Sequence, residues 1–186
     1  DGVKRVFVYP NMGDGGCATG AAMLAFGNDV CQAKPIETAY LGPDYSDEEI
    51  KQALDAEGVE YEDCGDDAER KIAEVLADNG IVARFNGRME YGPRALGNRS
   101  ILYPAKDPEV NQWLNDQLGR TEFMPFAPAV LADAAPRLFV GMDIGNTKTS
   151  EFMTLTFDCT DDMKEHSPAA VHIDGTARPQ LVTPTS

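Results

Sequence analysis

Residues 86–100 read NGRMEYGPRALGNRS and concentrate positive charge in an acidic protein. The chain has 186 residues, a formal net charge of -15 and a pI near 4.4. Nevertheless, four of its nine arginines fall within sixteen residues: Arg84, Arg88, Arg94 and Arg99. Guanidinium groups bind phosphate and carboxylate oxygens through paired N–H donors, and glycines let backbone N–H groups approach an anion. The segment therefore predicts an anion site. The alternative is a surface loop whose arginines pair with some of the 31 acidic residues.

Apolar patterns on both sides of this segment predict a strand before it and another after it. Residues 81–85 (IVARF) lead into the segment, and residues 101–103 (ILY) lead out of it. Upstream, residues 66–79 carry apolar side chains at helical spacing, with Gly80 as the stop. A helix over 46–54 is predicted to begin with a capping box, Ser-x-x-Glu.

The rest of the chain alternates between predicted helices and strands. At the start we expect a strand over 3–9, a Gly-rich loop over 10–16 and a helix over 18–25. Downstream we expect a helix over 108–118, a buried strand over 127–132, a helix over 134–139, a strand over 151–158 and a partner strand over 169–173. Val110, Trp113 and Leu114 are expected to face the core. This order predicts an α/β fold with a mixed, twisted sheet.

Composition argues against several classes of protein. The acidic balance argues against nucleic acids and anionic membrane surfaces as partners. No apolar run approaches the ~20 residues needed to cross a bilayer. The four cysteines are scattered without zinc-site spacing, so we expect free thiols and a cytoplasmic location.

Four ordered segments resemble motifs of one family, the O-carbamoyltransferases of the nodulation and antibiotic-tailoring type. They are GDGGCATGAA at 13–22, GRMEYGPRALGNRSIL at 87–102, RTEFMPFAP at 120–128 and HIDGTARPQ at 172–180. They are spread along essentially the whole chain, from residue 13 to residue 180. The sequence departs from the family pattern at two places: Leu118 and Gly119 stand where a lysine is usual, and Ala129 stands where many relatives have serine.

The resemblance implies two folds in one chain. Residues 1–33 would be the C-terminal remnant of an actin-like (ASKHA) domain, made of a strand, a loop and a helix. Residues 34–186 would be a YrdC-like domain with an open, twisted mixed sheet and helices, expected to continue beyond Ser186. The N-terminal ASKHA-like domain of the same enzyme is then an expected partner.

The resemblance also implies a reaction and its cofactors. The YrdC-like domain is expected to bind ATP and carbamoyl phosphate and to form carbamoyl adenylate, releasing phosphate and pyrophosphate. Mg²⁺ would accompany the ATP. The ASKHA-like domain would hold Fe²⁺ and pass the carbamoyl group to the hydroxyl of an acceptor.

Site residues follow from the resemblance and from the need to bring two anionic substrates together. We expect four arginines to act in catalysis: Arg88, Arg94, Arg99 and Arg120. Further residues are expected to bind substrate or nucleotide: Asn98, Ser100, His172 and Arg178. Asp14 would be an iron ligand only together with residues of the missing domain, since one carboxylate cannot hold iron alone.

Three of these residues have simpler interpretations. Arg88 would pair with Glu90, Asp14 would cap the next helix, and His172 would belong to a turn stabilised by Asp174 and Thr176. At the level of the whole chain, a non-catalytic nucleotide- or phosphate-binding module is the main alternative. An RNA-binding domain of the YrdC-like fold is a weaker one, because phosphate-backbone binding needs a broad basic face.

Overall fold

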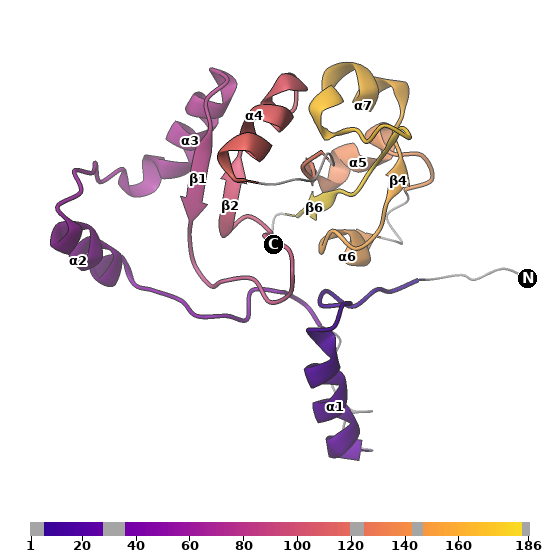
Figure 1. Cartoon of the computed structure of the whole chain (residues 1–186), viewed down its shortest axis with the longest axis horizontal. Coiled ribbons are helices and arrows are strands. Elements are labelled where there is room, and N and C mark those ends of the chain that lie inside the picture. The colour runs from indigo at the N-terminus through magenta and orange to yellow at the C-terminus, as the bar shows by residue number, and fades with distance from the viewer. Residues whose placement is uncertain (1–5, 28–35, 120–124, 143–146, 184–186) are drawn as a thin grey trace, which may run out of the picture. The chain divides into compact units, whose positions relative to one another are not determined.

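The protein is a mixed α/β structure, seen in a computed structural model that describes residues 6–27, 36–119, 125–142 and 147–183 (Figure 1). The helices are α1 (Gly16–Phe26), α2 (Asp47–Glu57), α3 (Ala68–Ala77), α4 (Glu109–Gln117), α5 (Ala135–Leu138), α6 (Thr147–Ser150) and α7 (Asp161–His166). Three 3-10 turns are η2 (Gly65–Asp67), η3 (Ala132–Ala134) and η5 (Pro168–Ala170). The strands are β1 (Val82–Phe85), β2 (Arg99–Leu102), β3 (Ala129–Leu131), β4 (Phe157–Asp158), β5 (Thr176–Ala177) and β6 (Gln180–Val182). The predicted α/β class is confirmed.

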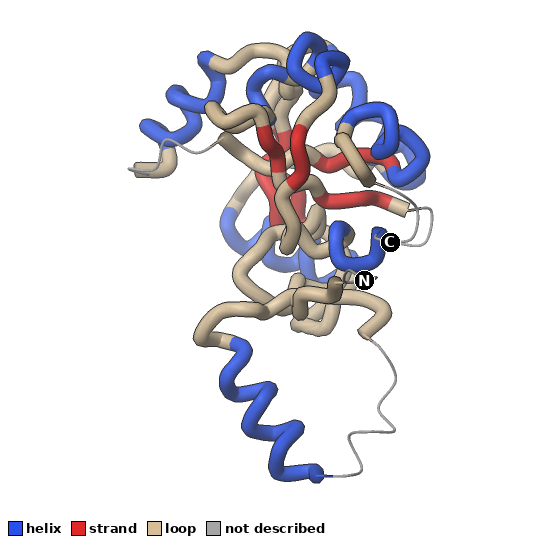
Figure 2. The backbone as a smooth tube through the Cα atoms, turned by 90° about the vertical axis from the view of Figure 1, so that its right-hand side faces the viewer, coloured by secondary structure: helices blue, strands red, loops and turns tan. Residues whose placement is uncertain are grey.

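The described strands form three two-stranded sheets (Figure 2). β1 and β2 are antiparallel, β3 and β6 are parallel, and β4 and β5 are antiparallel. The contacts divide the chain into two compact units. The first unit contains residues through Ala39, Gly92–Arg94 and everything from Ala105 onward; the second contains Tyr40–Tyr91 and Ala95–Pro104. The predicted domain boundary between residues 33 and 34 lies outside the described residues and stays a prediction.

The second unit holds the arginine-rich segment between β1 and β2, except for Gly92–Arg94. Val82 pairs with Leu102 and Phe85 with Arg99, so the two strands frame the segment as predicted, although β2 begins two residues early. α3 packs against β1. The chain turns between them at Gly80, whose N–H donates to the Val75 carbonyl at 2.8 Å. A Cβ at Gly80 would lie 2.5 Å from Val75 Cγ1, which explains the glycine there.

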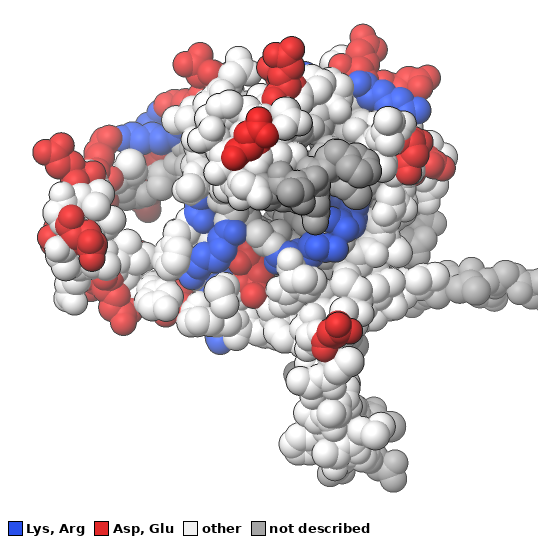
Figure 3. All heavy atoms as spheres, in the orientation of Figure 1, with Lys and Arg blue, Asp and Glu red and all other residues white. Residues whose placement is uncertain are grey.

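Helix α2 begins with the predicted capping box. The Ser46 hydroxyl accepts the Glu49 N–H at 3.3 Å, and the Glu49 carboxylate accepts the Ser46 N–H at 2.8 Å. This reciprocal pair satisfies two donors that a helix start leaves free. Acidic side chains cover the surface of α2, at the left of Figure 3, as expected for a solvated helix.

The first unit contains the main hydrophobic core. Its buried members come from β3, α5, the segment after α5, the residue after β4, α7, η5, β5 and β6: Val130, Ala135, Phe139, Met142, Cys159, Met163, Ala170, Ala177 and Leu181. The parallel pairing of β3 with β6 brings Val130 opposite Leu181. Thr160 caps α7 by accepting the Met163 N–H at 3.4 Å, which fixes the helix whose Met163 is 1% exposed.

Several predictions for the first unit are wrong. Residues 6–9 are irregular where a strand was predicted, while residues 3–5 lie outside the described part. The predicted strand over 151–158 is reduced to β4, because Met153 adopts a left-handed conformation (φ 53°) and Phe152 is buried at 3% exposure. The predicted partner over 169–173 contains η5 instead, and β4 pairs with β5.

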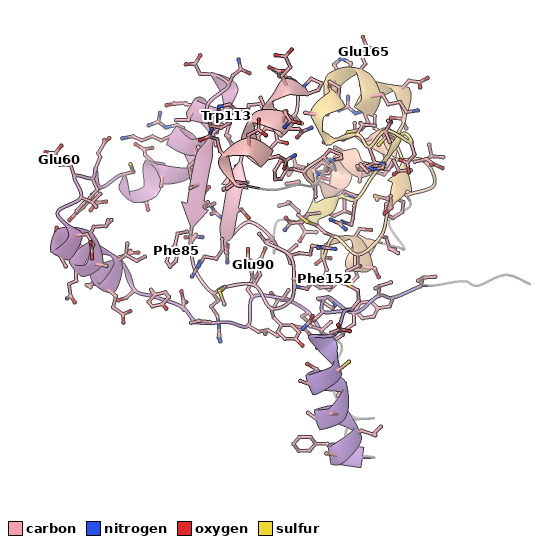
Figure 4. All side chains as sticks on the ribbon, in the orientation of Figure 1. Glu60, Phe85, Glu90, Trp113, Phe152 and Glu165 are labelled. Carbon is pink, nitrogen blue, oxygen red and sulfur yellow. The ribbon has the colours of Figure 1, made fainter. Side chains whose placement is uncertain are left out.

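Two further expectations concern burial. Leu114 faces the core on α4 at 4% exposure, but Trp113 is 52% exposed (Figure 4). The adjacent buried residue on α4 is Asn115 rather than an apolar side chain. β3 was predicted as a buried strand, yet only Val130 is buried and Leu131 is 69% exposed.

Helix α1 is uncharged and has no buried residue. Leu24 is 86% exposed and Phe26 is 71% exposed, and the helix is almost entirely white in Figure 3. A helix that is apolar on every side normally lies inside a larger protein or a membrane. In the described part of the chain, no helix has the length and apolar character of a membrane span.

Candidate functional site

The carboxylate of Glu90 stabilises the arginine-rich loop, residues 86–100 (Figure 4). Its Oε1 atom accepts three backbone N–H groups, from Leu96 at 2.7 Å, Asn98 at 2.8 Å and Arg99 at 3.1 Å. Burial by itself would raise the pKa of the Glu90 carboxyl, but these N–H donors outweigh it and hold the pKa below its ordinary value. The single acid among four arginines therefore organises the backbone of the loop.

Arg88 and Arg99 use their guanidinium groups on backbone carbonyls of the same unit. Arg88 donates to Gly42 O at 3.1 Å and Leu41 O at 3.2 Å. Arg99 donates to Asn86 O at 2.8 Å and Gly87 O at 3.0 Å, and its guanidinium lies 3.6 Å from the centre of the Phe85 ring. Among the described contacts, Arg88 does not pair with Glu90, so that simpler interpretation is wrong.

Arg84 forms an ion pair with Glu69 and donates to Gly97 O at 3.1 Å. This pair fits the alternative in which the cluster is neutralised by acids elsewhere in the chain. It accounts for one of the four arginines. Three of the four thus brace the loop against carbonyl oxygens or an acid, and only Arg94 stands apart.

Arg94 lies in the first unit with Arg178, and its charge acts on Arg178. Burial, and then the charge of Arg94, lower the pKa of the Arg178 guanidinium. Neither arginine forms a hydrogen bond or ion pair with another residue in the part of the chain that the structure describes, and the Nε atoms of both are buried. Because even partial burial of an uncompensated charge is costly, two such cations together favour an anionic ligand.

The backbone fixes the positions of both arginines. Arg94 follows Gly92, which has φ 112° and lies so close to Pro10 that a Cβ would be 3.2 Å from its carbonyl oxygen. Arg178 lies between β5 and β6, with Ala177 and Pro179 buried on either side. The two cations are therefore held by packed backbone and not by flexible side-chain contacts.

Asn98 and Ser100, which were predicted to bind substrate or nucleotide, make contacts inside the loop. Asn98 Nδ2 donates to Arg88 O at 2.8 Å, and Ser100 Oγ accepts the Gly97 N–H at 2.9 Å. Gly97 has φ 113°, a conformation that favours glycine, so this contact fixes a tight turn. Their roles toward a ligand stay predictions.

His172 lies at a turn of the predicted kind. Its Nδ1 is 3.1 Å from Asp174 Oδ1, which also accepts the Thr176 N–H at 3.0 Å and the Thr176 hydroxyl at 2.7 Å. The bonds from Thr176, and then the one from His172, hold the pKa of the Asp174 carboxyl below its ordinary value. The geometry agrees with the simpler interpretation, in which Asp174 and Thr176 stabilise the turn that precedes Arg178.

The structure places neither Asp14 nor Arg120 in a site. Arg120 lies outside the described residues. Asp14 is exposed, and its carbonyl accepts the Cys17 N–H at 3.1 Å, but α1 has no side-chain cap, so the capping interpretation is wrong. No group of three His, Cys, Asp or Glu side chains could hold a metal ion among the residues described. An iron site at Asp14 would need ligands from elsewhere.

Two residues of interest were not identified as such from the sequence. Glu90 was treated only as a possible partner of Arg88, although a lone acid in an arginine cluster was a usable signal. Ser150, at the end of α6, is fully buried, and its hydroxyl has no hydrogen-bond partner among the described residues. Nothing in the sequence around Ser150 signals this burial.

Comparison with known proteins identifies the family. Residues 73–186 match the family model described as Carbamoyltransferase C-terminus. The chain is 37% identical to Nodulation protein NolNO of Sinorhizobium fredii, over 97% of this chain and 27% of that protein. It is also 37% identical to an uncharacterized protein of Methanocaldococcus jannaschii, over 96% of this chain and 30% of the relative. Nodulation protein U of Rhizobium tropici is 35% identical, over 97% of this chain and 29% of that protein. The chain thus spans about a third or less of the length of these relatives.

Proposed function

Because the chain belongs to the carbamoyltransferase family, we propose that it binds ATP and carbamoyl phosphate and forms carbamoyl adenylate for transfer to an acceptor hydroxyl. One observation carries the proposal. Arg94 and Arg178 are partly buried cations, electrostatically coupled and without a partner in the described part of the chain. A polyphosphate is the kind of ligand that compensates two guanidinium groups at once.

The proposed reaction explains why the site needs cations more than a nucleophile. Water releases phosphate from carbamoyl phosphate, an oxygen of the resulting carbamate attacks the α-phosphorus of ATP, and pyrophosphate leaves. Both substrates are anions, so their approach is opposed by repulsion. Fixed guanidinium groups reduce this repulsion and stabilise the charge that develops on the leaving pyrophosphate. Mg²⁺ would enter with ATP and neutralise part of the same charge.

By family resemblance we also propose Arg88 and Arg99 as catalytic residues and Asn98 and Ser100 as binding residues. Arg88, Arg99, Asn98 and Ser100 already hold backbone atoms, so any role in binding would be exerted mainly through the shape of the loop they fix. By family resemblance, Arg120 remains a proposed catalytic residue and His172 a proposed binding residue. We also propose the cytoplasm as the location, where the free thiols of Cys17, Cys64 and Cys159 would stay reduced.

Transfer to the acceptor would need the remainder of a longer protein. These relatives are more than three times as long as this chain, and we propose that their additional length includes an ASKHA-like, iron-holding domain, with YrdC-like architecture assigned to residues 34–186. Helix α1 is the candidate contact with that domain, because it is apolar on all sides and has no buried residue. Asp14, just before α1, would join an iron site there.

A non-catalytic phosphate-binding module is the second candidate. Leu118, Gly119 and Ala129 replace the lysine and serine common in related sequences, which removes one cation and one hydroxyl. This candidate keeps the Arg94–Arg178 site but predicts binding without turnover.

Direct detection of the product separates the two candidates. The chain is mixed with ATP, Mg²⁺ and carbamoyl phosphate, quenched in acid and searched for carbamoyl adenylate by mass spectrometry. We expect the adenylate with wild type and with Arg137→Ala, an exposed arginine that pairs only with Asp162 among the residues described, but not with Arg94→Ala. ATP binding without adenylate in wild type would favour the second candidate.

A further inference from the structure

Ser150 carries a buried hydroxyl that lacks a hydrogen-bond partner among the residues described. The side chain is 0% exposed, and Oγ is one of the few buried polar atoms in this condition. The Nε atoms of Arg94 and Arg178 are also buried without a hydrogen-bond partner. A buried hydroxyl without a partner destabilises a folded protein, so it is retained where it serves a ligand or another purpose.

The segments that carry Ser150 and Arg178 pack against each other within the first unit. Helix α6, which ends at Ser150, packs against β6, and β6 begins two residues after Arg178. The neighbouring Thr149 hydroxyl donates to Val6 O at 3.2 Å. Four residues later, Pro10 contacts the backbone at Gly92, two residues before Arg94. Residues 6–10 thus link the end of α6 to the segment that holds Arg94.

We propose that the Ser150 hydroxyl is a third donor to the phosphoryl oxyanion bound by Arg94 and Arg178. The proposal rests on the proposed function, since it adds a residue to the same anion site. A phosphoryl group presents several oxygens, so two guanidinium groups do not exhaust its acceptors. A neutral hydroxyl adds a hydrogen bond without adding repulsion between cations. Thr149 cannot play this part, because its hydroxyl is already committed to Val6.

Paired variants at adjacent positions test this assignment. Ser150→Ala removes the hydroxyl, and Thr149→Val removes a hydroxyl that is bonded within the protein. Affinities of the chain for pyrophosphate and for carbamoyl phosphate are measured by calorimetry, and the midpoint of thermal unfolding is measured without ligand. We expect Ser150→Ala to weaken one or both anions about tenfold, the loss typical of one hydrogen bond to a charged group, with no fall in the midpoint. Thr149→Val is expected to lower the midpoint and to keep both affinities.

The two anions identify the source of the phosphoryl group. A loss confined to pyrophosphate assigns Ser150 to the phosphates of ATP, and a loss confined to carbamoyl phosphate assigns it to that substrate. Unchanged affinities in Ser150→Ala, or no binding of either anion by wild type, would overturn the proposal. So would a fall in the midpoint as large as that of Thr149→Val without a loss of affinity. Tenfold weaker anion binding by Ser150→Ala, together with no carbamoyl adenylate formed by wild type, would contradict the proposed reaction but leave the assignment of Ser150 intact.

Discussion

The Glu90 carboxylate and the Asn98 backbone are joined by a hydrogen bond of 2.8 Å between residues eight positions apart. The same oxygen also accepts the N–H groups of Leu96 and Arg99, so one side chain closes the whole turn. Since the side chain is only 7% exposed, water cannot readily replace it. The shape of the arginine-rich loop therefore depends on its single acid.

Replacing Glu90 is expected to destabilise the second unit strongly. Glu90→Ala leaves three backbone donors without an acceptor, and we expect a loss of about 3 kcal/mol in the free energy of unfolding. Glu90→Gln keeps an acceptor oxygen but loses the charge, so its cost should be smaller. Urea denaturation of both variants measures the difference. Equal stability of wild type and Glu90→Ala would show that the loop has another anchor.

The same carboxylate makes stability depend on pH. Because the folded pKa of Glu90 is lowered, its ionised form contributes stability above its ordinary pKa of 4.5, and that contribution is lost as the pH falls through this value toward the folded pKa. The difference in unfolding free energy between wild type and Glu90→Gln should therefore shrink from about pH 7 to about pH 3. A constant difference would contradict the role of the charge.

Arg94 and Arg88 should respond in opposite ways to replacement by alanine. Arg88 braces Gly42 and Leu41, so Arg88→Ala is expected to lower the unfolding midpoint. Arg94 stands beside another cation without a described partner, so Arg94→Ala should keep or raise the midpoint of the free chain while abolishing stabilisation by pyrophosphate. Thermal unfolding with and without pyrophosphate measures both effects. A lower midpoint for Arg94→Ala would mean that Arg94 is structural.

Two neighbours on α4 provide a matched pair for the core. Leu114 is 4% exposed and Trp113 is 52% exposed. Leu114→Ala should cost about 3 kcal/mol because it leaves a cavity, whereas the larger truncation Trp113→Ala should cost less than about 1 kcal/mol. Chemical denaturation tests the order, and the reverse order would place Trp113 in the core.

We expect helix α1 to be exposed to solvent in this chain and to contact another domain in a longer protein. Leu24 and Phe26 are largely exposed, so Leu24→Asp and Phe26→Asp should leave the unfolding midpoint unchanged. Both should reduce binding of an apolar dye and self-association in light scattering. A clear loss of stability would show that α1 is already packed within this chain.

The sequence predicted best where the interactions are local. The Ser46–Glu49 capping box, the helix that ends near Gly80 and the strands around the arginine loop all depend on neighbours within a few residues. The strand predicted over 151–158 failed although Met153, Leu155 and Phe157 alternate. Burial of Phe152 and the left-handed backbone at Met153 depend on the packing of the first unit, which no local pattern encodes.

The site divides in the same way. The sequence showed the arginine cluster, and the cluster predicted an anion site. The sequence did not show which arginine stays without a partner, because Arg94 acts electrostatically on Arg178, which is 84 positions away along the chain. The parallel pairing of β3 with β6, which follows Arg178, is equally non-local and was not predicted.

Carbamoyl-phosphate-dependent ATP–pyrophosphate exchange tests the central claim most directly, because it reports reversible adenylate formation without an acceptor. The account predicts exchange by the wild-type chain that requires carbamoyl phosphate, is lost in Arg94→Ala and persists in Arg137→Ala. Calorimetry under the same conditions confirms that wild type binds ATP. ATP binding without exchange, or exchange that is unaffected by Arg94→Ala, would contradict the claim that the Arg94–Arg178 site forms carbamoyl adenylate.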